Sequence, residues 1–101
     1  MTNNLHTSEV IENNVDERMI REIGIYNINE AVKLYNEAVS TYNLIDAKHL
    51  AQERAMIILK HAMPHLQECK RIGFNDVRIQ KIIDGMSHIM LMNPSSSLKS
   101  I

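Results

Sequence analysis

The feature that most constrains the fold of this chain is the recurrence of an apolar residue at every third or fourth position over most of its length. The clearest run is made of Ile28, Ala31, Tyr35, Ala38, Tyr42 and Ile45. An earlier run, which predicts another buried helical stripe, is made of Ile11, Val15, Met19, Ile23 and Tyr26. This spacing gathers side chains on one face of an α-helix, whereas a half-buried strand alternates at every second residue. Because no strand-like alternation appears, we expect an all-α fold.

Turn and capping residues divide the pattern into four predicted helices, over about residues 8–24, 28–43, 47–72 and 76–92. Gly24 and Gly73 are expected to end the first and third helices, since glycine tolerates the left-handed conformation found at helix ends. Asn27, Asp46 and Asn75 are the predicted N-caps of the helices that follow them. A second helix that continues into the third remains an alternative.

The third predicted helix has an apolar surface wider than one stripe. One face holds Ala51, Ala55, Ile58, Ala62, Cys69 and Ile72, and the stripe beside it holds Met56, Leu59, Met63 and Leu66. So wide an apolar arc indicates a helix that is central in a bundle or partly covered by another subunit. Pro64 lies inside this helix and is expected to kink or break it, because proline lacks a backbone N–H and clashes with the preceding turn.

Short connections between helices favour antiparallel neighbours, so we predict a compact antiparallel bundle of three to four helices. The bundle is expected to form one domain over residues 1–94, followed by a mobile tail over residues 95–101 that begins after Asn93 and Pro94. A single domain of this length should have a radius of gyration of about 13 Å.

The composition of the chain bounds its class. At 101 residues, with 45% apolar and 23% charged residues, it resembles an ordinary soluble domain. Its one cysteine, Cys69, cannot form an internal disulfide, which is typical of a reducing compartment. No secretory signal is visible, and no apolar run approaches the roughly 20 residues that a membrane span needs. We therefore expect a cytoplasmic protein that does not bind membranes.

The charge is unevenly divided along the chain. Residues 1–50 hold four Lys and Arg against eight Asp and Glu, a net charge of −4, whereas residues 51–101 hold seven against four, a net charge of +3. This asymmetry can steer an anionic partner to the second half, or join two copies through halves of opposite charge. Random fluctuation of small sums explains it equally well.

No pattern in the sequence predicts catalysis. His61, His65 and Cys69 are spaced four apart and could present ligands for Zn²⁺ on one helical face, but a fourth ligand would have to come from elsewhere. Asp46 and His49, with Glu53, lie on the polar side of the same helix and lack the matching carboxylates of a di-metal bundle. Since no nucleophile motif or phosphate-binding glycine loop appears either, we expect no enzyme activity, no metal and no cofactor.

One local pattern centres on Gly73. A small residue, Cys69, precedes this glycine by four positions, and the apolar Phe74 and the capping Asn75 follow it. The next helix has apolar positions at Ile79, Ile82 and Ile83 and reaches Gly85. In this pattern, the segment from His65 to Gly85 resembles the helix-turn-helix of bacterial and phage repressors.

The resemblance implies a DNA-binding transcriptional regulator. Lys70 and Arg71 would then contact the DNA backbone, and Arg78, Gln80 and Lys81 would lie on the exposed surface that reads base edges. Departures from the family pattern are Glu68, in a position that is usually apolar, and Asp76 and Asp84, which dilute the basic surface.

The methionines suggest another kind of partner. Met86, Met90 and Met92 cluster at the end of the last predicted helix, and methionine-rich surfaces adapt to several partners. Together with the second stripe of the third helix, they predict a protein interface made of Met56, Leu59, Met63, Met86, Met90 and Met92. The alternative interpretation is that the same residues fill the core of a small, irregular bundle.

The sequence therefore favours a small non-enzymatic regulator, adaptor or inhibitor that binds another protein through its helices and self-associates as a homo-oligomer. The first alternative is the helix-turn-helix DNA-binding protein, and the second is a protein that binds a small ligand at a subunit interface.

Overall fold

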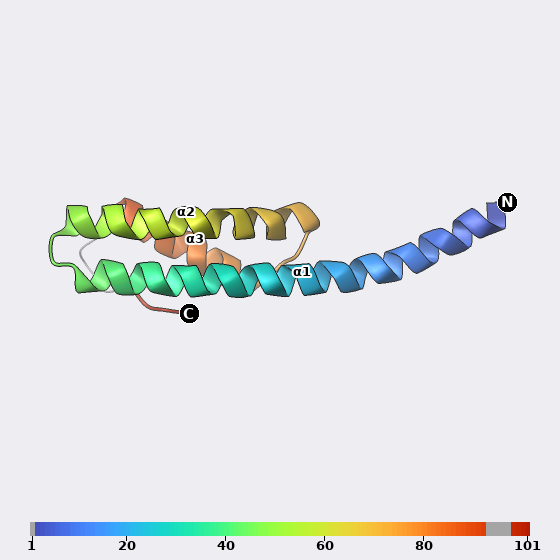
Figure 1. The fold of residues 1–101 in the computed structure, drawn as a ribbon, viewed down its shortest axis with the longest axis horizontal. Helices are drawn as coiled ribbons and strands as arrows, with labels where there is room; N and C mark the ends of the chain where they lie inside the picture. The colour runs from blue at the N-terminus through green and yellow to red at the C-terminus, as the bar shows by residue number, and fades with distance from the viewer. Residues whose placement is uncertain (1, 93–97) are drawn as a thin grey trace.

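The computed structural model describes the backbone of residues 2–92 and 98–101, and the side chains of residues 16–92 and 98–101. Its three helices are α1 (Thr2–Leu44), α2 (Lys48–Ile72) and α3 (Val77–Met90). The described residues form no strand, so the prediction of an all-α fold is confirmed (Figure 1). The described residues form three helices, which agrees with the prediction of three to four. The number is three because the first two predicted helices form one continuous helix, α1.

Gly24 does not end a helix, contrary to the prediction. It is buried inside α1, and a Cβ built on it would lie 2.2 Å from Cγ of Phe74. Its role is therefore to let the Phe74 ring approach the helix backbone. Asn27 is not an N-cap either: it is only 7% exposed, and its Nδ2 donates to the carbonyl of Ile23 at 2.8 Å within the same helix.

The length of α1 gives the molecule an elongated shape. Its 43 residues correspond to about 65 Å at 1.5 Å per residue. The principal extents are 67 × 20 × 17 Å, and the radius of gyration is 18.3 Å rather than the expected value of about 13 Å. The first turns of α1 extend beyond α2 and α3 (Figure 1), while Glu17 and Ile20 lie beside the turn at Phe74.

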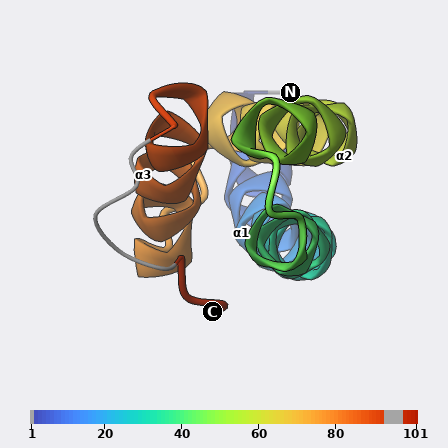
Figure 2. The same cartoon turned by 90° about the vertical axis from the view of Figure 1, so that its left-hand side faces the viewer.

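Small residues let α1 and α2 pack closely along their length. The alanines of this seam, all fully buried, are Ala31, Ala38, Ala51, Ala55 and Ala62. Larger buried residues complete the core and include Ile28, Tyr35, Tyr42, Leu59, Ile82 and Ile89. Figure 2, viewed along the bundle, shows α3 on one side of the α1–α2 pair. The stripe predicted over 28–45 is thus largely buried, whereas in the stripe before it Met19 and Tyr26 are 48% and 59% exposed.

The predicted boundary between the second and third helices is confirmed, because α1 ends at Leu44 and α2 begins at Lys48. The predicted N-cap Asp46 is wrong. The N-cap is Ala47, whose side chain makes no capping hydrogen bond. Lys48 instead bridges the turn, with its Nζ donating to the carbonyl of Tyr42 at 3.1 Å.

The turn between α2 and α3 begins at Gly73 as predicted. Gly73 has a φ of 76°, its N–H donates to the carbonyl of Lys70, and the N–H of Phe74 donates to the carbonyl of Cys69 at 2.9 Å. These two bonds satisfy carbonyls that the end of α2 leaves free. The N-cap of α3 is Asp76 rather than the predicted Asn75.

Pro64 lies inside α2 without breaking it, so the predicted break is wrong, and no kink is shown. Proline removes the hydrogen bond to the carbonyl of Lys60, four residues earlier. Both Pro64 and Lys60 are exposed, which leaves water free to hydrate that carbonyl.

The predicted tail after residue 94 lies partly outside the described residues. Its last four residues lie along α1, where the Asn36 side chain donates to the Ile101 carbonyl at 3.1 Å and accepts from the Ile101 N–H at 2.8 Å. Asn43 donates to the carbonyl of Leu98 at 2.9 Å, and both terminal apolar residues pack against the core. The mobility of this segment stays a prediction.

Candidate partner-binding groove

A groove of about 550 Å³ lies between α2 and α3 and is open to solvent. Its walls are mostly apolar and are made of Met63, Leu66, Gln67, Lys70, Phe74, Asn75, Ile79, Ile83, Met86, Ser87 and Met90. Within this wall Ile83 is 42% exposed and Met90 is 58% exposed. Exposed apolar side chains that line a hollow are typical of sites for an apolar ligand or for a partner's side chains.

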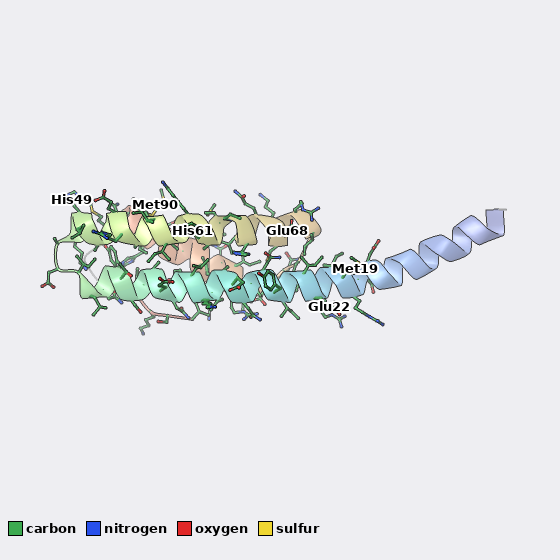
Figure 3. All side chains as sticks on the ribbon, in the orientation of Figure 1. Met19, Glu22, His49, His61, Glu68 and Met90 are labelled. Atoms are coloured by element: carbon green, nitrogen blue, oxygen red, sulfur yellow. The ribbon has the colours of Figure 1, made fainter. Side chains whose placement is uncertain are left out.

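The position of α3 keeps the groove open. Gly85 lies against Tyr35 of α1, so closely that a Cβ on Gly85 would be 1.9 Å from the tyrosine hydroxyl. About one turn further along α3, Gln52 of α2 donates through Nε2 to the carbonyls of Ile89 and Met90, at 3.2 and 2.8 Å. Figure 3 shows Met90 near the end of α2 that carries His49. These contacts hold α3 against both other helices and so fix the two walls of the groove.

The six predicted interface residues are divided between this groove and the core. Met63, Met86 and Met90 line the groove. Leu59 is fully buried between the helices and cannot contact a partner, because the second stripe of α2 faces α3. Met56 is half-buried against the core. Met92 lies beyond α3 and does not line the groove.

Sequence reasoning missed Phe74, Ile79 and Ile83 as groove residues. Part of their signal was visible, since Ile79 and Ile83 were identified as apolar positions of the last predicted helix and Phe74 as the apolar residue after Gly73, but only the methionines of that helix were selected for the interface. Ile82 and Ile89 do enter the core, whereas Ile83 lies one position away on the outer side. The apolar stripe of α3 therefore contributes both to the core and to the wall of the groove.

Most of the residues that the helix-turn-helix resemblance selects are held by side chains of the same chain. Arg71 forms an ion pair with Glu68, and Nη2 of Arg78 lies 2.8 Å from Oδ2 of Asp76. Gln80 donates to Asp84 at 2.9 Å. Lys70 and Lys81 are exposed, and Lys70 lines the groove.

The carboxylate of Asp76, the N-cap of α3, makes the stability of the fold depend on pH. Hydrogen bonds from the Arg78 side chain, and then from the Arg78 backbone N–H, lower the pKa of Asp76 from 3.8 to about 2. A carboxylate whose pKa is lowered by folding stabilises the fold at pH values above its unfolded pKa. That contribution is lost as the pH falls from about 4 to about 2.

The Asp76 contribution can be measured by chemical denaturation of wild type and of Asp76→Asn across this pH range. Asparagine keeps the cap, so the difference in unfolding free energy between the two proteins should shrink as the pH falls from about 4 and disappear below about pH 2. Asp76→Ala should cost about 1 kcal/mol at neutral pH through loss of the cap. A difference that stays constant from pH 6 to pH 2 would contradict this assignment.

The side chains considered as metal ligands point to separate environments. His61 is exposed, whereas Nδ1 of His65 is 2.8 Å from Oδ1 of Asn27. Cys69 is fully buried with Sγ 3.8 Å from the Gly24 carbonyl, and burial is the main cause that raises the pKa of its thiol. No three potential ligands converge within the part of the chain that the structure describes.

No protein-family model, curated protein sequence or solved structure matches this chain. None of the helices in the described residues has an apolar run long enough to cross a bilayer. The geometry of the groove therefore carries the functional argument.

Proposed function

We propose that this chain is a non-enzymatic binding protein, a small regulator, adaptor or inhibitor, that receives an apolar helix of a protein partner between α2 and α3. The observation that supports this proposal is the open groove with exposed Ile83 and Met90 in its wall. Burial of such side chains by a partner is favourable at roughly 25 cal/mol for each Å² removed from water.

A helix suits this groove better than a flat surface does. The groove runs between two helices that already pack on α1, so a helix laid into it would add a fourth member to the bundle. Three methionines in its wall can adjust to the side chains that enter. The chain's own terminal residues, Leu98 and Ile101, are bonded to α1 by Asn43 and Asn36.

The geometry favours this proposal over the two alternatives. A DNA-binding surface needs free cations, whereas two of the four selected cations, Arg71 and Arg78, are paired with carboxylates of the same chain, which leaves Lys70 and Lys81. A small ligand would be expected to find a few convergent polar groups, and the groove wall is predominantly apolar. Both alternatives become outcomes of the test below.

Ile83→Asp and Met90→Lys should each weaken partner binding at least about tenfold, because each puts a charge where an apolar side chain would be buried. Lysine at position 90 also suits the C-terminal end of α3, which favours positive charge. The measurement is quantitative recovery of bound protein from host lysate by the tagged wild type and variants, with and without nuclease.

Val77→Asp is the matched control, since Val77 is 76% exposed on the same helix and does not line the groove. It should retain the partner that the two groove variants lose. Equal recovery by all three variants would contradict the proposal. Recovery that depends on nucleic acid would favour the helix-turn-helix alternative instead.

A further inference from the structure

A second apolar surface lies on the face of α1 and α2 that is turned away from α3. Figure 2 shows α3 on one side of the α1–α2 pair and no other described element on the opposite side. On that opposite face, a hollow of about 460 Å³ is lined by Thr41, Ile45, Leu50, Arg54, Ile57 and Ile58. Leu50 is 42% exposed and Ile57 is 52% exposed. We call the face around this hollow the open face.

The charges of the open face differ between its two helices. Glu30 and Glu37 lie one heptad apart on the α1 side, and Arg54 and His61 lie one heptad apart on the α2 side. Glu37 and Arg54 are both exposed, and neither takes part in an ion pair with another described residue. Because Glu30 is paired with Lys33 at 3.9 Å, the charges of this face that lack a described partner are Glu37 on the α1 side and Arg54 on the α2 side.

The charged positions lie at matching levels along the bundle. Asn27 contacts His65, and Gly24 contacts Cys69, across the antiparallel α1–α2 pair. Continued residue by residue, this pairing places Glu37 level with Ala55, next to Arg54. It likewise places Glu30 level with Ala62, next to His61.

We propose that the open face binds the open face of a second copy, about a two-fold axis parallel to the long axis of the bundle. This axis lays α1 of each protomer on α2 of its partner while keeping every residue at its own level. Glu37 of each protomer then faces Arg54 of the partner subunit, and the apolar residues of the two hollows meet. A two-fold axis across the bundle would instead lay α1 on α1 and, where it passes at the level of Glu37, set this carboxylate against its own copy, which like charge disfavours.

The first turns of α1 give independent support for a second copy. They extend beyond α2 and α3 with no other described element beside them (Figure 1). The sequence places Ile11, Val15 and Met19 four positions apart there, and Met19 is 48% exposed. An isolated amphipathic helix as short as this extension of α1 is only marginally stable in water. In the proposed dimer both α1 helices leave the bundle at the same end and run parallel on opposite sides of the axis, so their apolar stripes can close on each other beyond the bundle.

Sedimentation equilibrium of the full chain over a dilution series tests this dimer. Wild type should sediment as a dimer that dissociates on dilution. Glu37→Lys alone and Arg54→Glu alone should each weaken association at least about tenfold, since each creates two like-charge contacts across the axis. Both positions are exposed, so both variants should keep the wild-type helical content.

An equal mixture of Glu37→Lys and Arg54→Glu should restore dimers, because each mixed pair regains two contacts of opposite charge. A wild-type chain that is monomeric at every concentration would overturn the proposal, and so would a mixture that stays monomeric. Ile57→Asp should abolish the dimer while Ile83→Asp leaves it intact. The groove lies on the other side of α2, so failure of the dimer and failure of the proposed partner binding give distinct results.

Discussion

Replacement of Leu59 with alanine is expected to lower the free energy of unfolding by about 3 kcal/mol, within the range of about 2–5 kcal/mol for large-to-small changes in a core. Leu59 is fully buried and belongs to the core cluster between the helices. The loss combines the removed apolar contacts with the cavity that remains. For a domain of this size it corresponds to a fall in melting temperature of roughly 12–24 °C.

Ile57→Ala provides the matched control for this prediction. Ile57 lies two residues earlier on α2 and is 52% exposed. In the monomer, at high dilution, its replacement should change the free energy of unfolding by less than about 0.5 kcal/mol. Urea denaturation of both variants measures the two values, and similar small losses would show that Leu59 is not a core residue.

Gly85→Ala is expected to destabilise the protein by about 2 kcal/mol, although helix propensity alone predicts a gain of about 1 kcal/mol. The new Cβ would lie 1.9 Å from the Tyr35 hydroxyl and 2.5 Å from Cε1 and Cζ of the same ring. Tyr35 is only 3% exposed and belongs to the core cluster, so any shift of the ring must displace its packed neighbours. The sign of the change, measured by denaturation, separates the packing contact from the propensity.

The same alanine substitution can be repeated in a Tyr35→Leu background. Leucine lacks the hydroxyl and the outer ring atoms that the new Cβ would meet. In that background Gly85→Ala should be neutral or stabilising, which gives a coupling energy of about 2–3 kcal/mol between the two positions. If Gly85→Ala costs the same in both backgrounds, the close approach of Tyr35 is not the cause.

The sequence was sufficient for the fold class and for much of the packing. The stripe from Ile28 to Tyr42 is buried because a regular helical spacing needs only one neighbouring surface to bury it. The turn at Gly73 was equally predictable, since a local hydrogen-bond pattern determines it. These features depend on residues that are close in the chain.

The errors arose where a residue type serves two physical purposes. Glycine is suited to a left-handed turn and to a close approach of another side chain, and only the position of Phe74 shows that Gly24 serves the second. Asn27 was taken for an N-cap, whereas it bonds to His65, which is distant in sequence. Leu59 was assigned to a partner surface because the sequence does not show that α3 covers it.

Site-specific photo-crosslinking in living host cells tests most directly whether the groove binds a protein. A photoreactive amino acid at position 83, in the groove wall, should yield one discrete adduct with another protein. The same amino acid at position 81, exposed on α3 but outside the groove, should yield little of that adduct. Equal adducts from both positions, adducts only with a second copy of the chain, or adducts only with nucleic acid would contradict the proposed function.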